Sequence, residues 1–90
     1  MIKPENPFEE AIIKACNELA ETLIQKNRDY RNSYSESREH FKNPSYNNEK
    51  IPFVFHAIEK LKRYETCGSL DSVLDLAGYS ILELVCRSEE

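Results

Sequence analysis

Apolar residues recur at three- and four-residue steps in three stretches of the chain, a spacing typical of amphipathic helices. The first stretch follows Asn6, a favoured N-cap, with Pro7 at the first helical position and Glu9 placed for a capping box. We therefore predict a helix over residues 7–26. Its apolar stripe consists of Phe8, Ile12, Cys16, Leu19 and Leu23.

Two more helices are predicted in the second half of the chain. The first covers residues 52–67 and should end at Gly68, a natural C-terminal stop. We expect its inner side to carry Ile51, Phe55, Ile58 and Leu61. The second covers residues 70–87 after the N-cap Ser69, and Gly78 within it is tolerable where another helix approaches closely. Its wide apolar stripe is Leu70, Val73, Leu74, Ala77, Ile81, Leu84 and Val85.

Residues 27–50 differ in character, being rich in Asn, Ser and charge with four aromatic residues spaced along them. Irregular segments of this length are uncommon in compact domains and are usually functional or mobile. The simpler interpretation is a solvated connection whose aromatic side chains anchor it to the core, with a short helical turn near residues 37–41. No strand-like alternation appears, so the predicted fold is all-α: one domain, residues 1–90, with three main helices in a small bundle and a long polar loop after the first.

The composition of the chain argues against several classes of function. Ninety residues bury only a modest core, so we expect a homo-oligomer. The net charge of −4 argues against non-specific binding to nucleic acid or to a membrane surface. Three cysteines with no close pair suit reduced thiols, and no apolar run has the length of a membrane span or a signal peptide. These features predict a cytoplasmic protein.

Three polar groups lie at helical spacing and are candidates for chemistry: Glu18 with Glu21; His56 with Lys60 and Arg63; and Asp71 with Asp75 and Tyr79. Carboxylates from two packed helices could hold Mg²⁺, and Lys60 and Arg63 could neutralise phosphates. Each group also has a simpler explanation. Glu18 and Glu21 suit a solvated helix face, Asp71 suits the first turn of a helix, and the two basic residues could pair with Asp71 or Asp75 across the hairpin. Two glycines cannot make a Gly-rich phosphate loop, and no nucleophile–base pair stands out.

Three short motifs carry a resemblance to a known family. They are a Lys-Asn-x-Asp-Tyr run at Lys26 to Tyr30, a Lys-x-x-Arg pair at Lys60 and Arg63, and an Asp-x-x-x-Asp-Leu-x-x-Tyr run from Asp71 through Asp75 to Tyr79. Together they resemble small helical phage and bacterial proteins of the nucleotide-modification-associated class. That class is in turn similar to MazG-like all-α nucleoside triphosphate pyrophosphohydrolases, whose Glu-x-x-Glu and Glu-x-x-Asp motifs hold Mg²⁺.

The resemblance implies a nucleotide ligand. The chain keeps a Glu-x-x-Glu at Glu18 and Glu21, but Asp71 and Asp75 at a four-residue step replace the second metal motif. The leading hypothesis is therefore a cofactor-free phage-type protein that sequesters a nucleotide or a nucleotide signal of host defence. Its expected ligand-binding residues are Lys26, Asp29, Tyr30, Tyr34, His56, Lys60, Arg63, Asp75 and Tyr79.

Two alternatives remain open. A Mg²⁺-dependent pyrophosphohydrolase would hold its metal with Glu18, Glu21, Asp71 and Asp75. A protein-interaction or inhibitor module would instead need an exposed apolar or tyrosine-rich patch.

Overall fold

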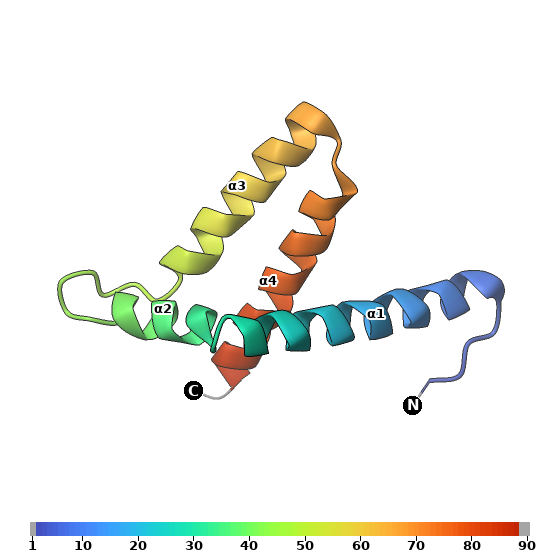
Figure 1. The fold of residues 1–90 in the computed structure, drawn as a ribbon, viewed down its shortest axis with the longest axis horizontal. Helices are drawn as coiled ribbons and strands as arrows, with labels where there is room; N and C mark the ends of the chain where they lie inside the picture. Colours follow the sequence, from blue (N-terminus) through green and yellow to red (C-terminus); the bar gives the residue numbers. More distant parts are fainter. Residues whose placement is uncertain (1, 89–90) are drawn as a thin grey trace.

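A computed structural model describes residues 2–88, and over this range the chain folds into helices alone (Figure 1). They are α1 (Pro7–Asp29), α2 (Ser33–Phe41), α3 (Ile51–Cys67) and α4 (Leu70–Ser88). The all-α class is confirmed, and the helices predicted at 7–26, 52–67 and 70–87 correspond to α1, α3 and α4. The count of three main helices is corrected to four, because α2 lies inside the segment 27–50 that we predicted as a loop. None of the helices within residues 2–88 combines the length and apolar character that crossing a bilayer requires.

Local capping interactions fix the helix ends that the sequence predicted. The Glu9 backbone N–H donates to Asn6 Oδ1 at 2.9 Å, and Asn6 Nδ2 donates to Glu9 Oε2 at 2.9 Å. At the end of α3, Gly68 adopts a left-handed conformation with φ 65°, and its N–H donates to the Tyr64 carbonyl at 2.7 Å. Both devices satisfy backbone groups that a helix end leaves unpaired.

The corner between α1 and α2 explains why α2 was predicted only as a short helical turn near residues 37–41 and not as a helix from Ser33 to Phe41. Arg31 and Asn32 have φ of 52° and 60°, a left-handed conformation that residues other than glycine rarely adopt. Asn27 Nδ2 donates to Asn32 Oδ1 at 2.5 Å, and the Asn32 N–H donates to the Asn27 carbonyl at 3.1 Å. These asparagine contacts turn the chain at the corner between α1 and α2 (Figure 1) without a glycine or proline to mark it.

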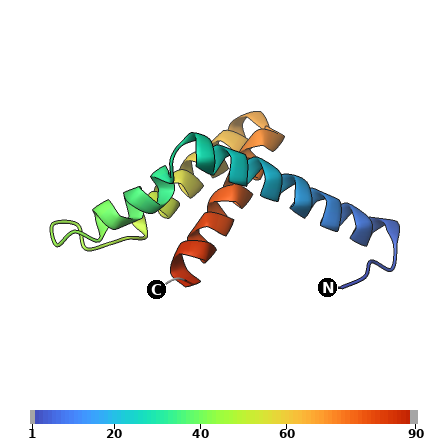
Figure 2. The ribbon, with the colours of Figure 1, turned by 60° about the horizontal axis from the view of Figure 1, so that its bottom comes forward.

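Helices α3 and α4 form an antiparallel hairpin, and α1 crosses α4 near its middle (Figures 1 and 2). At the crossing, a Cβ added to Gly78 would lie 3.4 Å from Leu23 Cδ1. The close helix approach expected at Gly78 is therefore confirmed. Helix α2 packs against α3, and its side chains Tyr34 and Arg38 reach Glu83 in the C-terminal half of α4.

The prediction that the apolar stripes of α3 and α4 face the interior is wrong for the single chain. Phe55, Ile58 and Leu61 of α3 are exposed, and so are all the large residues of the wide α4 stripe. Lys60 and Ser72 are buried instead. Of the aliphatic and aromatic side chains within residues 2–88, only Tyr34, at 7% exposure, and Pro52 are buried. Periodicity locates an apolar stripe but does not reveal which side of a helix meets another helix.

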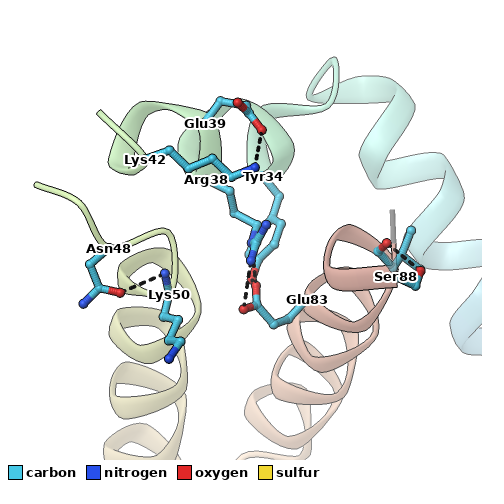
Figure 3. Close-up of polar contacts among 9 residues, drawn as sticks. Tyr34, Arg38, Glu39, Lys42, Asn48, Lys50, Glu83 and Ser88 are labelled. Carbon is cyan, nitrogen blue, oxygen red and sulfur yellow. Dashed lines mark hydrogen bonds and ion pairs between the residues drawn. The ribbon is translucent and has the colours of Figure 1, made fainter. Parts of the chain in front are cut away.

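A three-residue polar cluster joins α2 to α4 (Figure 3). The side chain of Arg38, 2% exposed, donates from Nε to Glu83 Oε1 at 2.9 Å, and the Tyr34 hydroxyl donates to the same oxygen at 2.8 Å. Burial, together with the hydrogen bond to Glu83, raises the pKa of Tyr34 well above its usual range. The hydroxyl thus stays a donor, and the cluster holds the Tyr34 ring in place.

Removing the Arg38 charge should destabilise the fold strongly. Because Arg38→Met leaves Glu83 without its cation in a largely buried position, we expect the free energy of unfolding to fall by about 3 kcal/mol. Lys14→Met, in a 3.9 Å ion pair with Glu18 on the exposed side of α1, should cost less than about 1 kcal/mol. Urea unfolding followed by circular dichroism measures both. Equal losses would show that the cluster does not anchor α2.

Candidate functional site

A cavity of about 320 Å³ lies between α1, α2 and α4. Its walls include five of the predicted ligand-binding residues: Lys26, Tyr30, Tyr34, Asp75 and Tyr79. Leucines supply an apolar portion of the wall, at positions 19, 23, 74 and 82. The combination of an apolar wall with a few convergent polar groups is typical of small-molecule sites.

Helical spacing accounts for most of this convergence. Lys26 and Tyr30 are four residues apart at the end of α1, and Asp75 and Tyr79 are four apart on α4, so each pair projects from one side of its helix. Tyr34 enters from the first turn of α2, where the cluster with Arg38 and Glu83 positions it. The left-handed corner at Arg31 and Asn32 brings the start of α2, with Tyr34, next to the end of α1, with Lys26 and Tyr30.

Asp75 is the electrostatic centre of the site. Its Oδ1 lies 3.6 Å from Lys26 Nζ, and its Oδ2 lies 3.4 Å from Lys60 Nζ. The pairing of Lys60 with Asp75 across the hairpin is therefore confirmed. The Lys60 side chain is only 11% exposed and also lies 3.3 Å from Glu59, whereas Lys26 is 54% exposed. Lys60 thus neutralises the Asp75 carboxylate from α3, outside the cavity lining, whereas Lys26 lines the cavity and is accessible to a ligand.

Aromatic rings form the other half of the site. The rings of His56 and Tyr79 stack with centroids 4.2 Å apart and an interplanar angle of 4°, and the Tyr34 and Tyr79 centroids are 6.0 Å apart. Burial lowers the pKa of His56 and outweighs the negative charge of Glu59, which acts in the opposite direction, while the positive charge of Lys60 adds a smaller lowering. Within residues 2–88, His56 Nδ1 is buried and has no hydrogen-bond partner. His56 therefore supports the Tyr79 ring as a neutral group and lies outside the cavity lining.

Other predicted residues are not brought into the cavity. Asp29 accepts a hydrogen bond from Gln25 Nε2 at 2.9 Å, and Arg63 is exposed on α3; neither belongs to the lining. The carboxylate of Glu18 pairs with Lys14 on the exposed side of α1. In the part of the chain that the structure describes, no three His, Cys, Asp or Glu side chains gather as a metal-binding group.

Sequence reasoning missed two hydroxyl residues of the cavity, Thr22 and Ser33. Thr22 lies one helical turn before Lys26, so the spacing that pairs Lys26 with Tyr30 could have found it. Ser33 could not have been found in this way, because its position depends on the left-handed corner before α2.

The lowered pKa of His56 predicts a loss of stability in mild acid. The unfolded chain takes up a proton on this histidine near its ordinary pKa, while the folded chain does so only at lower pH, so stability is complete above about pH 6.5 and falls as the pH drops toward the folded pKa. His56→Gln should flatten the free energy of unfolding between about pH 7 and pH 5.5. His40→Gln, on α2, is the matched control and should retain the fall. Urea titrations at several pH values measure the slopes, and identical slopes for both variants would contradict the assignment.

The arrangement offers one accessible ammonium, one neutralised carboxylate and an aromatic wall around a cavity of small-molecule size. These groups suit the binding of a ligand that combines an anion, hydroxyls and a flat ring. No family model matches the chain, and no curated protein or solved structure shows significant similarity to it.

Proposed function

We propose that the chain binds a nucleotide or a nucleotide-derived small molecule in the cavity between α1, α2 and α4. The observation that carries the proposal is the convergence of Lys26, Tyr30 and Asp75 on one cavity. A nucleotide needs a cation for its phosphate, an acceptor for its ribose hydroxyls and a flat surface for its base. Each of these three residues supplies one of them.

Each residue has a defined part in the proposed complex. Lys26 swings from Asp75 to the phosphate, which its exposure permits, and forms a charge-assisted hydrogen bond. Asp75, still neutralised by Lys60, accepts a hydrogen bond from a ribose hydroxyl. Tyr30 stacks on the base, since its ring is 67% exposed, whereas the ring of Tyr34 is covered and its hydroxyl is committed to Glu83.

The size of the cavity favours a single nucleotide unit. About 320 Å³ lies at the lower end of the range for small-molecule sites. The resemblance of the three motifs to phage proteins extends the proposal to sequestration: the chain holds a nucleotide signal of host defence in the cytoplasm without converting it. Cys16, Cys67 and Cys86 are all free thiols, which fits a reducing compartment.

The pyrophosphohydrolase of MazG-like type is the competing proposal, and of its four expected metal ligands only Asp75 lines the cavity. It requires Asp75 to take up Mg²⁺ together with Glu18, Glu21 and Asp71, but two ammonium groups already engage the Asp75 carboxylate. A metal would have to displace them. Sequestration moves only the exposed Lys26 and leaves the Lys60–Asp75 pair intact, and it is therefore the function that we favour.

Nucleotide binding is tested by calorimetry with AMP, GMP, CMP, UMP and cyclic dinucleotides, each with and without Mg²⁺. We expect at least one to bind, and Lys26→Gln to weaken it by roughly 10- to 100-fold, the loss typical of a hydrogen bond to a charged group. Tyr30→Leu should weaken binding by about 1–3 kcal/mol through lost stacking. Lys14→Gln, an exposed lysine on the same helix, is the matched control and should leave affinity unchanged.

Chromatography of the bound ligand separates the two proposals. Recovery of the intact nucleotide agrees with sequestration, whereas Mg²⁺-dependent release of pyrophosphate would establish the enzyme. If no nucleotide binds, or if Lys26→Gln and Lys14→Gln bind equally well, the proposed site is wrong.

A further inference from the structure

One side of α4 is apolar over its whole length, and the chain buries none of the residues on it. At 100° per residue, Leu70, Val73, Leu74, Ala77, Ile81, Leu84 and Val85 fall within an arc of about 120°. All but Ala77 are exposed, with Leu70 at 77% and Leu84 at 69%. The opposite side of α4 meets the other helices through Ser72, Asp75, Tyr79 and Glu83. We call this exposed arc the α4 stripe.

Helix α3 repeats the pattern. Its exposed apolar residues share one side of the helix, which we call the α3 stripe: Val54, Phe55, Ile58, Leu61 and Tyr64. The side that faces α4 carries His56 and Lys60 instead. The hairpin thus places Lys60, Asp75 and the His56–Tyr79 ring stack between its helices and leaves both apolar stripes exposed.

The N-terminal half of α1 is also uncovered. The stripe that contributes Leu19 and Leu23 to the cavity continues toward the N-terminus through Cys16, Ile12 and Phe8, and Phe8 is 76% exposed. Figures 1 and 2 both show this half of α1 running on past the other helices. The apolar stripe of α1 is longer than the part of the helix that packs against other helices. The remaining apolar surface is therefore available for another molecule to cover.

The uncovered area has the size of a stable interface. A compact monomer of 10.5 kDa should expose about 5,400 Å², and this chain exposes 7287 Å², an excess of roughly 1,900 Å². Its radius of gyration is 15.2 Å, against about 12 Å for a compact chain of this length. Obligate homodimers bury roughly 2,000–5,000 Å² in total, and the excess from two chains falls within that range.

From these observations we infer that a second copy of this chain covers the apolar stripes, with the N-terminal half of α1 of each copy packed on the α3 and α4 stripes of the other. Each copy carries both surfaces, so a two-fold arrangement satisfies both at once. The inference concerns the outer faces of the helices and does not rest on nucleotide binding. Leu74, which belongs both to the α4 stripe and to the cavity wall, places the two surfaces next to each other.

Sedimentation equilibrium of the wild-type protein at micromolar concentrations tests assembly directly. We expect twice the 10.5 kDa chain mass or a higher multiple. A mass of 10.5 kDa over the whole range would overturn the inference and indicate that another protein or a lipid surface covers the stripes.

Alkylation of cysteines tests the placement of α1 in the unmodified protein. Cys16 lies on the α1 stripe and Cys67 at the end of α3, and both are exposed in the single chain. We expect iodoacetamide to modify Cys16 at least about tenfold more slowly than Cys67, because assembly buries it. Equal rates would show that the N-terminal half of α1 lies outside the interface.

A matched pair of variants completes the test. Ile12→Glu places a carboxylate on the α1 stripe, and Lys14→Glu places the same group on the opposite side of the helix. We expect Ile12→Glu to lower the mass toward that of one chain, with or without loss of helicity, and Lys14→Glu to keep the wild-type mass. An assembled and helical Ile12→Glu protein would contradict the proposed packing.

Discussion

Polar and charged contacts, rather than an apolar core, hold α2 and α3 against α4, and the rest of the structure depends on this. Arg38 and Tyr34 meet Glu83 at one end of α4, and Lys60 meets Asp75 at the other. Buried charges are costly unless they are paired in good geometry, so a different arrangement of the helices would leave a buried charge without its partner. The contacts therefore specify how the helices are arranged while adding less stability than an apolar core of the same size would.

This arrangement has opposite consequences on the two sides of α4. On the inner side, Asp75 and Tyr79 stay close to Lys26 and Tyr30, so the cavity has a charged and aromatic wall suited to a nucleotide. On the outer side, the apolar residues that would normally fill a core face solvent in the single chain. The proposed ligand site and the proposed interface between copies thus have the same origin.

Sequence reasoning succeeded where the signal was local. Asn6 and Gly68 set helix ends through contacts within a few residues, and helical spacing grouped Asp75 with Tyr79. The Lys-Asn-x-Asp-Tyr motif grouped Lys26 with Tyr30. It failed where the answer depended on distant partners. The stripe holding Ile58 was assigned to the inside because apolar residues usually face a core, and nothing in its periodicity reveals that Lys60 has a buried partner on α4. Asp29 belongs to the same motif as Lys26 and Tyr30 but lies outside the lining. Both residues of the Lys-x-x-Arg pair, Lys60 and Arg63, also lie outside it.

The most direct test of the account is the dependence of unfolding on protein concentration. If the apolar stripes are covered only when copies assemble, folding is coupled to association. A hundredfold rise in protein concentration should then stabilise the folded state by about 2.7 kcal/mol and raise the urea midpoint of unfolding. If the midpoint is the same at both concentrations, one chain is stable with its apolar faces in water. That result would contradict the claim that the core is completed by a second copy.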